Sequence, residues 1–292
     1  MRRRLTVAAT TVLAAVGMLF AVPAAPAQAA ALPVDWNWMN GFFGNILDPQ
    51  TPPPGANDFG CKGTAAKPPV ILVHGTWENQ KDNWAAFSPF LKNNGYCVFT
   101  FNYGGNITDT TYGWKSITSN AEELRNFVGL VRVATGARRV DLVGHSQGGM
   151  MPRYYIKNLG GAGKVDDLVG LAPSNHGTTN PGALVAGATF CPACDQQRAG
   201  SPFLTALNAG DETPGSVSYT QIETRYDEVV TPYTSAFLAP GPNTANVLLQ
   251  DACPAEVIDH HEMPNDALAI RWALQALGRT GPADTAHPPS CV

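Results

Sequence analysis

The sequence predicts an α/β fold with a mostly parallel central sheet and helices on both faces. Short, continuous apolar runs occur at 70–73, 140–143 and 165–172, which is typical of strands buried on both faces. Helical patterns separate these runs, and strands that alternate with helices of about 10–15 residues form βαβ units whose strands lie parallel. The order of the elements therefore indicates the fold class before any motif is considered.

The other elements follow from local patterns. Apolar residues recur at helical spacing in 83–94, and the β-branched and aromatic residues of 96–101 predict a strand. Ser119 and Glu122 match a capping box that opens a helix, and Gly136 is expected to end it. Four further elements are expected: a helix at 147–159, strands at 217–224 and 245–250, and a helix at 266–277.

Two segments lack a regular pattern. Residues 30–68 are rich in proline, glycine and asparagine, which predicts an extended N-terminal arm. Residues 176–217 contain no clear strand, and a segment of that length in a compact domain is usually functional. We therefore expect a lid-like insertion after the strand at 165–172.

The first 29 residues resemble an export signal. Arg2–Arg4 form a positive start, an apolar run follows at 5–22, and Ala27-Gln28-Ala29 fits the small-x-small cleavage rule. An uncleaved anchor is the alternative, because about 18 apolar residues approach the minimum membrane span. We expect cleavage, which leaves residues 30–292 as a single secreted domain, monomeric and without a transmembrane segment.

Composition narrows the class of protein. Charged residues make up 14% of the 292 residues, hydrophobic residues 44%, and the net charge is −4. Disordered chains are richer in charge and poorer in apolar residues, so disorder of the whole chain is excluded. Nucleic-acid binding is also excluded, since an acidic chain offers no basic surface to phosphates.

Export also makes disulfides the expected state of the six cysteines. Six cysteines allow 15 connectivities, and we expect pairing in chain order: Cys61–Cys97, Cys191–Cys194 and Cys253–Cys291. A zinc half-site at Cys191 and Cys194 is the alternative, but the sequence has no second C-x-x-C motif. No carboxylate cluster argues for calcium, so neither a metal nor another cofactor is expected.

The motif that carries chemistry is G-x-S-x-G at Gly144–Gly148. It lies directly after a predicted buried strand and directly before a predicted helix, which is the context of a nucleophile elbow. The turn is so tight that both flanking positions require glycine. Ser146 is thereby presented at the carboxyl end of the sheet, where open α/β sheets bind ligands. We take Ser146 as the candidate nucleophile.

A serine hydroxyl needs a base to take its proton, and on this fold the partners follow in the order serine, acid, histidine. Four of the six histidines precede the serine, follow it too closely or lie in a proline-rich tail: His74, His145, His176 and His287. The other two, His260 and His261, lie in a loop before the last helix. The residues alone leave the choice between these two open.

Asp227 is the candidate acid because it follows the predicted strand at 217–224 and precedes an apolar anchor at 229–230. Asp251, also at a strand end, is the alternative. The tetrahedral intermediate needs two amide donors. One is expected from Gln147, which follows the nucleophile, and the other from Thr76, in the loop after the first buried strand.

At these residues the chain resembles the secreted bacterial class 2 lipases of the α/β-hydrolase superfamily, and within them the actinobacterial triacylglycerol lipase branch. The resemblance is carried by five segments: Pro69–Thr76, Gly95–Phe99, Gly144–Gly149, Thr224–Val230 and Asp259–Met263. It implies a triad of Ser146, Asp227 and a histidine. In related lipases the catalytic histidine is followed by one residue, then typically glycine and an aliphatic residue. That frame favours His260, with Glu262 at the usual glycine.

The resemblance implies hydrolysis of carboxylic esters through an acyl-enzyme, on lipid or small ester substrates at an oil–water interface. An acyltransferase, a polyester hydrolase or a peptidase with the same triad is the alternative, and a non-catalytic binding protein on this fold is the rival from another class. Five apolar residues of 177–207 are candidates for a wall or lid of the acyl groove: Leu184, Val185, Phe190, Phe203 and Leu204.

Overall fold

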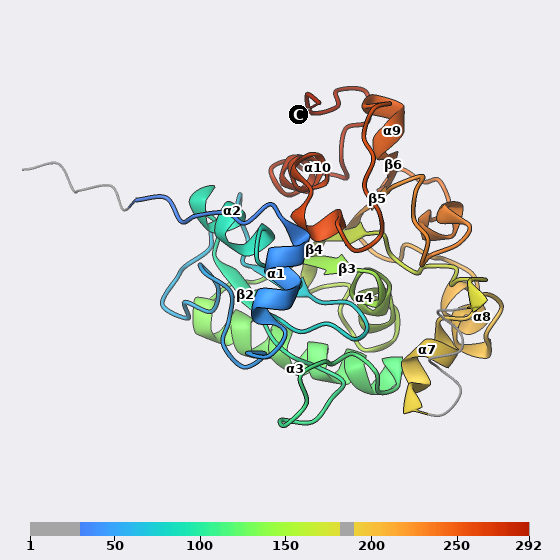
Figure 1. The fold of residues 1–292 in the computed structure, drawn as a ribbon, viewed down its shortest axis with the longest axis horizontal. Helices are drawn as coiled ribbons and strands as arrows, with labels where there is room; N and C mark the ends of the chain where they lie inside the picture. The colour runs from blue at the N-terminus through green and yellow to red at the C-terminus, as the bar shows by residue number, and fades with distance from the viewer. Residues whose placement is uncertain (1–29, 182–189, 292) are drawn as a thin grey trace, which may run out of the picture. The chain divides into compact units, whose positions relative to one another are not determined.

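Six strands form one sheet in the order β2-β1-β3-β4-β5-β6, and every neighbouring pair is parallel. The computed structural model describes residues 30–181 and 190–291. The expected signal peptide, 1–29, lies outside the described residues. The strands are β1 (Val70–Val73), β2 (Val98–Thr100), β3 (Val140–His145), β4 (Val165–Leu171), β5 (Ser218–Glu223) and β6 (Thr244–Leu248). The α/β fold predicted from the sequence is confirmed (Figure 1).

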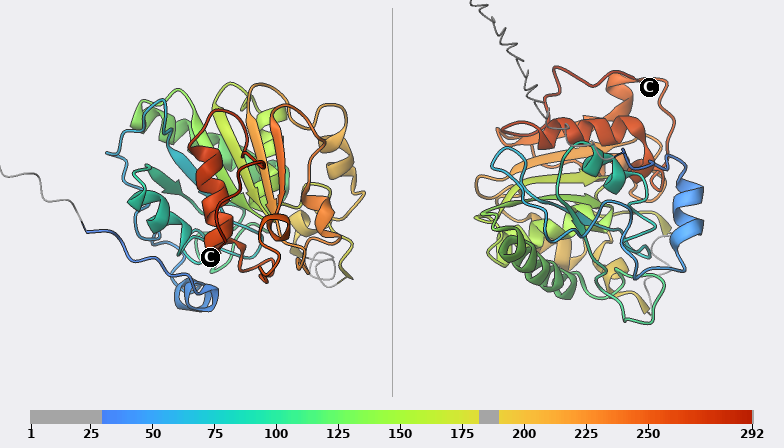
Figure 2. Two further views of the ribbon diagram at one scale, coloured as in Figure 1. Left: turned by 90° about the horizontal axis from the view of Figure 1, so that it is seen from above. Right: turned by 90° about the vertical axis from the view of Figure 1, so that its left-hand side faces the viewer.

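Helices cover both faces of this sheet (Figure 2). The helices are α1 (Trp38–Asn45), α2 (Phe87–Asn93), α3 (Ile117–Thr135), α4 (Gln147–Asn158), α7 (Pro192–Gln196), α8 (Pro202–Asn208), α9 (Leu249–Ala252) and α10 (Ala267–Leu277). Two short 3₁₀ turns, Tyr233–Ala236 and Met263–Asn265, complete the described elements. No helix among the described residues is long and apolar enough to cross a membrane.

The core consists of two apolar clusters, one on each face of the sheet. In β1, Val70 and Leu72 pack into the cluster under α2 and α10, whereas Ile71 and Val73 pack into the cluster under α3 and α4. Successive side chains of a strand point to opposite faces. An uninterrupted apolar run is therefore what a strand covered on both faces requires.

Besides shorter elements such as α2, which begins at Phe87 rather than at 83, three elements differ from the sequence prediction. The helix predicted to open at Ser119 begins at Ile117, because the capping residue is Ser116, three residues earlier, whose side chain accepts a hydrogen bond from the Ser119 amide. Gly136 does end this helix, in the left-handed conformation. The strand predicted to continue to residue 250 ends at Leu248, where α9 begins.

The third difference lies in the N-terminal arm, which contains α1. Asn37 caps this helix by accepting a hydrogen bond from the Asn40 amide. The expected extended segment is thus partly helical. Sequence periodicity did not reveal the helix because apolar side chains surround it, including exposed Met39 and Phe43.

The three disulfides are Cys61–Cys97, Cys191–Cys194 and Cys253–Cys291, the pairing expected in chain order. The first joins the N-terminal arm to the residue before β2, across 36 residues of sequence. The last joins the C-terminal segment to the end of α9. The Cys191–Cys194 bridge closes the first turn of α7.

We predict that replacing Cys61 and Cys97 together by serine lowers the free energy of unfolding by about 3–4 kcal/mol, because the bridge restricts a long loop in the unfolded chain. The Cys191–Cys194 bridge closes a far shorter loop, so replacing both of its cysteines by serine should lower the free energy of unfolding by only about 1–2 kcal/mol. Denaturant titration of both variants measures the difference, and an equal or reversed order would contradict this account.

Candidate active site

Ser146 lies in a sharp turn between β3 and α4. Its backbone angles, φ 54° and ψ −121°, are unusual for a residue with a side chain and cost about 1–3 kcal/mol. Such strain persists only where the surroundings impose it. The Ser146 amide donates to the carbonyl of Leu171 at 2.9 Å, which ties the turn to the end of β4.

The flanking glycines are required by close backbone contacts. A Cβ atom on Gly144 would lie 1.8 Å from the carbonyl oxygen of Gly148. A Cβ atom on Gly148 would lie 2.0 Å from the carbonyl oxygen of Val73, at the end of β1. The second contact is with a neighbouring strand rather than with the turn itself. Both positions therefore exclude any side chain, as the G-x-S-x-G pattern predicts.

His260 and Asp227 form a buried pair at the carboxyl end of the sheet. Nδ1 of His260 lies 2.7 Å from Oδ2 of Asp227. The other carboxylate oxygen of Asp227 accepts hydrogen bonds from the amides of Val229 and Val230, at 2.8 and 2.7 Å. The apolar anchor after Asp227 thus holds the carboxylate through its backbone.

The pKa values of this pair move in opposite directions. Burial alone would raise the pKa of Asp227, but His260 and the two amides outweigh it and hold the pKa below its ordinary value. Burial alone would lower the pKa of His260, but Asp227, with Glu78 and Glu228, raises it above the ordinary histidine value. An imidazole with raised proton affinity is suited to accept a proton from a hydroxyl group.

The neighbouring histidine has different contacts. The His261 side chain is 45% exposed, stacks on Trp38 with ring centroids 5.4 Å apart, and lies 3.8 Å from Glu228. His176 binds Glu212 instead, at 3.0 Å. Among the adjacent histidines that the sequence left open, His260 is the one that contacts Asp227.

The other candidate carboxylates have other environments. Asp251, the alternative acid, is exposed and lies 3.7 Å from Arg225. Glu223, at the end of β5, is buried, and its burial together with the charge of Asp227 raises its pKa well above the ordinary value. The carboxylate that contacts His260 is Asp227, whose pKa is held low, whereas the pKa of Glu223 is raised.

Ser146 and His260 line the same cavity of about 480 Å³, together with His145, His261 and Thr76. In the described part of the chain, no direct hydrogen bond joins the Ser146 hydroxyl to the His260 ring. Serine–histidine bonds are often long without substrate and tighten when one binds. The two side chains that the sequence placed in one site thus share one pocket.

Two backbone amides close to the nucleophile have no protein acceptor. Within the described residues, the amides of Thr76 and Gln147 donate no hydrogen bond to the protein. The side chain of Gln147 donates to Thr76 Oγ1 at 2.7 Å and to the carbonyl of Gly113 at 2.6 Å. These bonds join the loop after β1 to the start of α4, so both amides are held in place.

The cavity has an apolar side formed by α1. Trp38 and Phe42 from this helix line it, as do Trp77, Val229 and Val230. The sequence predicted an extended arm here and assigned none of its residues to the site. The only available signal was its unusual density of aromatic residues.

The insertion after β4 contributes different residues from those expected. Thr178, Cys194 and Gln197 line the cavity. Leu204 is buried in the core and Phe203 packs against it, so neither forms the expected wall. Phe190 lines a separate surface hollow with Trp77. Leu184 and Val185 lie outside the described residues.

A family model described as lipase (class 2) matches residues 67–273. The chain belongs to the class 2 lipase family. It is 29% identical over 214 residues to lipase B of Pseudozyma antarctica, an alignment that covers 69% of this chain and 59% of that protein.

This class 2 lipase also has bacterial relatives. A triacylglycerol lipase of Pseudarthrobacter phenanthrenivorans is 37% identical over 95 residues, which is 31% of this chain and 28% of the relative. The alignments thus span about three fifths and about a quarter of the two relatives' lengths.

Two solved structures share the fold. Lipase B of Aspergillus fumigatus superposes with a TM-score of 0.68 at 24% identity, covering 80% of this chain and 57% of that one. A Bacillus licheniformis lipase in mature form has a TM-score of 0.57 at 17% identity, with 74% and 94% covered. At these identities the likeness concerns the fold.

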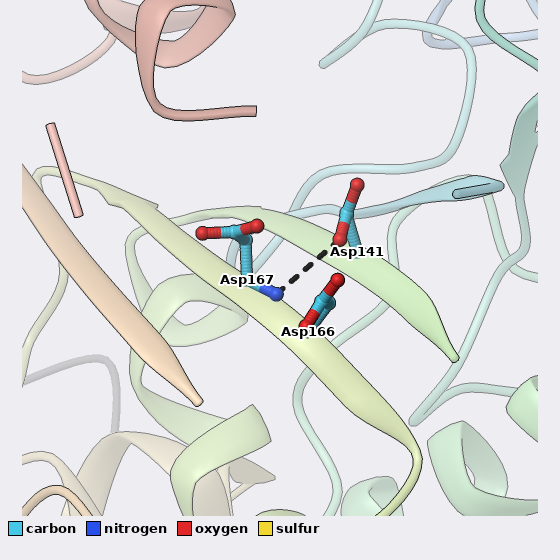
Figure 3. A group of neighbouring side chains, drawn as sticks. All are labelled: Asp141, Asp166 and Asp167. Carbon is cyan, nitrogen blue, oxygen red and sulfur yellow. Dashed lines mark hydrogen bonds between the residues drawn. The ribbon is translucent and has the colours of Figure 1, made fainter. Parts of the chain in front are cut away.

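This class 2 lipase also brings three carboxylates together away from the cavity, at the amino ends of β3 and β4 (Figure 3). Oxygens of Asp141, Asp166 and Asp167 lie within 4.8 Å of one another, close enough to surround one cation. The sequence showed no such cluster because an irregularity in the β3–β4 register sets Asp141 opposite the other two.

The charge of the cluster is already partly balanced. Asp166 pairs with Arg139 at 2.7 Å. Burial raises the pKa of Asp167 to about 7, and burial with the neighbouring carboxylates raises that of Asp141 well above its ordinary value. The two buried groups therefore bind protons more tightly than free carboxylates do.

This arrangement predicts a pH effect on stability. Because the folded state holds these protons more tightly than the unfolded chain, the free energy of unfolding falls as pH rises through the raised pKa values. We expect Asp141→Asn, which can still accept from the Asp167 amide, to raise the melting temperature at pH 8 by about 2–4 °C or more, and less at pH 5.

Asp166→Asn is the matched control, because Asp166 is partly exposed and paired with Arg139. Calorimetry at both pH values measures the effect. If Asp141→Asn is less stable than the wild type at pH 8, or if added calcium ions stabilise the wild type, the ionised carboxylates stabilise the fold, which contradicts this account.

Proposed function

We propose that this class 2 lipase is a secreted serine ester hydrolase that cleaves carboxylic esters, acylglycerols among them, through an acyl-enzyme. One observation carries the proposal: Asp227 holds His260 at 2.7 Å in the cavity that Ser146 enters from a strained turn. Nucleophile, base and orienting acid come from three loops that meet at the carboxyl end of one parallel sheet.

In the proposed mechanism, the Ser146 oxygen attacks the ester carbonyl carbon while Nε2 of His260 takes the hydroxyl proton. The negative charge of Asp227 stabilises the resulting imidazolium. His260 then gives the proton to the alcohol oxygen as the bond from the carbonyl carbon breaks. A water molecule repeats the sequence on the acyl-enzyme and releases the acid.

The amides of Thr76 and Gln147 are the proposed oxyanion donors. The carbonyl oxygen becomes negative in the tetrahedral intermediate, and preorganised donors stabilise that charge without reorganisation. The Gln147 side chain, bonded to Thr76 and to Gly113, holds the two donor-bearing segments at a constant separation. The Gln147 amide would thus bind the substrate oxyanion, while the Gln147 side chain holds Thr76 in position.

The apolar side of the cavity supports a lipid substrate. Its wall on α1 continues onto exposed Met39 and Phe43, which are 54% and 62% accessible. Exposed apolar groups beside a pocket are typical of contact with apolar ligands or lipid surfaces. The relatives named as triacylglycerol lipases support the same substrate class.

Secretion is supported by the disulfides. The three pairs use all six cysteines of the chain. Disulfides persist in oxidising compartments. Together with the signal-like first 29 residues, they favour an extracellular protein.

We predict that Ser146→Ala or His260→Ala lowers kcat for p-nitrophenyl esters by at least about 10⁴-fold, because the triad acts as a unit. His261→Ala is the matched control: it removes the adjacent imidazole and should retain most of the activity. Steady-state kinetics and melting temperature are measured together. Activity retained by Ser146→Ala, or lost equally with His261→Ala, would refute the assignment.

We predict that the double variant Met39→Ser/Phe43→Ser hydrolyses emulsified triacylglycerol about tenfold or more slowly, because it loses apolar contact area. Hydrolysis of soluble p-nitrophenyl acetate should be unchanged. Leu130→Ser/Val133→Ser is the control, since these residues are as exposed but lie on α3 and do not line the cavity. Equal losses in both double variants would contradict a role for α1 in lipid contact.

A further inference from the structure

We infer that Glu78 is a positioning residue: through His145 it joins the loop that carries the Thr76 amide to the loop that carries His260. Glu78 has so far appeared only as a charge that helps raise the pKa of His260, and His145 has no part in the mechanism derived above. The inference rests on the proposed function, because it concerns how that site is held in its reactive geometry.

Glu78 binds the oxyanion loop directly. Its Oε2 accepts a hydrogen bond from the Gly75 amide at 2.8 Å. A Cβ atom on Gly75 would lie 2.3 Å from the same oxygen, so glycine is what allows this approach. The residue that follows is Thr76, whose amide is one of the two proposed oxyanion donors. Glu78 therefore fixes the backbone immediately before that donor.

His145 binds Glu78 on one side and the catalytic loop on the other. Its Nδ1 lies 3.0 Å from Glu78 Oε2, and its Nε2 lies 3.0 Å from the backbone carbonyl oxygen of His260. The ring centroids of His145 and His260 lie 4.8 Å apart. One carboxylate and one imidazole thus span the distance between the two loops.

The contacts indicate which atoms carry hydrogen. A carbonyl oxygen only accepts, so Nε2 of His145 must donate to His260. A carboxylate oxygen also accepts, so Nδ1 donates to Glu78 when that carboxylate is ionised. With Asn83 oriented so that its unpartnered Oδ1 faces Nδ1, the ring has a third acceptor. His145 therefore connects Glu78 to the His260 carbonyl through its two ring nitrogens.

The other titratable groups around Glu78 leave His145 as the ring that binds it. Burial, with the charge of Glu78, raises the pKa of Asp82 to about 8, so Asp82 is a neutral acid at pH 7. Burial lowers the pKa of His74 to about 4, so that ring is neutral. Tyr103 is neutral because burial raises its pKa. His260 and His261 also face the carboxylate but do not bond to it.

Both side chains of the pair are almost fully buried, 7% exposed for Glu78 and 1% for His145. Removing either one leaves the other buried without this hydrogen-bond partner, which is costly. Asp227 orients the His260 ring, whereas His145 fixes the backbone from which that ring extends. An error of about 1 Å in such positioning can cost about 100-fold in rate.

The first experiment uses Glu78→Gln, which can still accept from the Gly75 amide but carries no charge. We expect kcat for p-nitrophenyl esters to fall about 10–100-fold with KM unchanged, because the apolar pocket remains while the reacting groups shift. Glu212→Gln is the matched control. Glu212 also accepts from a histidine ring and a backbone amide, those of His176 and Ala239, but it lies outside the cavity lining.

The second experiment separates positioning from packing. Gln places an amide NH₂ near the position of histidine Nε2, and Asn places one near Nδ1. His145→Gln can therefore still donate to the His260 carbonyl, whereas His145→Asn cannot reach it. We expect His145→Gln to retain a kcat at least about tenfold above that of His145→Asn. This comparison also decides the question if Glu78→Gln does not fold.

Equal kcat values for the two His145 variants, or a Glu78→Gln enzyme as active as Glu212→Gln, would overturn the inference. A wild-type protein without esterase activity would instead overturn the proposed function. In proton NMR spectra, Glu78→Gln should lose one downfield imidazole N–H resonance and keep that of the His260–Asp227 pair. Loss of both resonances would indicate general disruption and contradict a positioning role.

Discussion

The architecture depends on one backbone constraint, the close approach of three strands at the turn that carries Ser146. The carbonyl of Val73, at the end of β1, lies where a side chain of Gly148 would be, and the Ser146 amide is bonded to Leu171 at the end of β4. The neighbouring strands therefore hold the serine in a conformation that it would not adopt alone. The same contacts place it at the carboxyl edge of the sheet, where the following loops converge.

Strand order then determines which loops reach the serine. β1 and β4 flank β3, so the loops after them reach Ser146 directly and supply Thr76 and the residues of the insertion. β5 and β6 lie on one side, and the segments that follow them bring Asp227 and His260 to the same edge. Each of these positions was expected from local pattern: apolar runs, a glycine-bounded serine, and polar residues just after strands.

What the sequence did not predict depends on contacts between distant segments. Glu78 and His145 are 67 residues apart, and no spacing rule relates them. The cluster around Asp141 arises from an irregularity in the β3–β4 register, which no residue pattern predicts. Helix α1 was not predicted because apolar side chains lie all around it, and Phe203 was misassigned because apolar residues of an insertion fit a core as well as a groove. The choice between His260 and His261 likewise needed the position of Asp227.

The most direct test of the triad is covalent labelling with a p-nitrophenyl alkylphosphonate, which traps a nucleophile that a neighbouring base has activated. Peptide mass spectrometry should find the phosphonate on the Ser146 oxygen alone. The inactivation rate should fall as pH drops through a histidine pKa above its ordinary value, and it should collapse in His260→Ala. Labelling of another residue, or an equal rate in His260→Ala, would contradict the account.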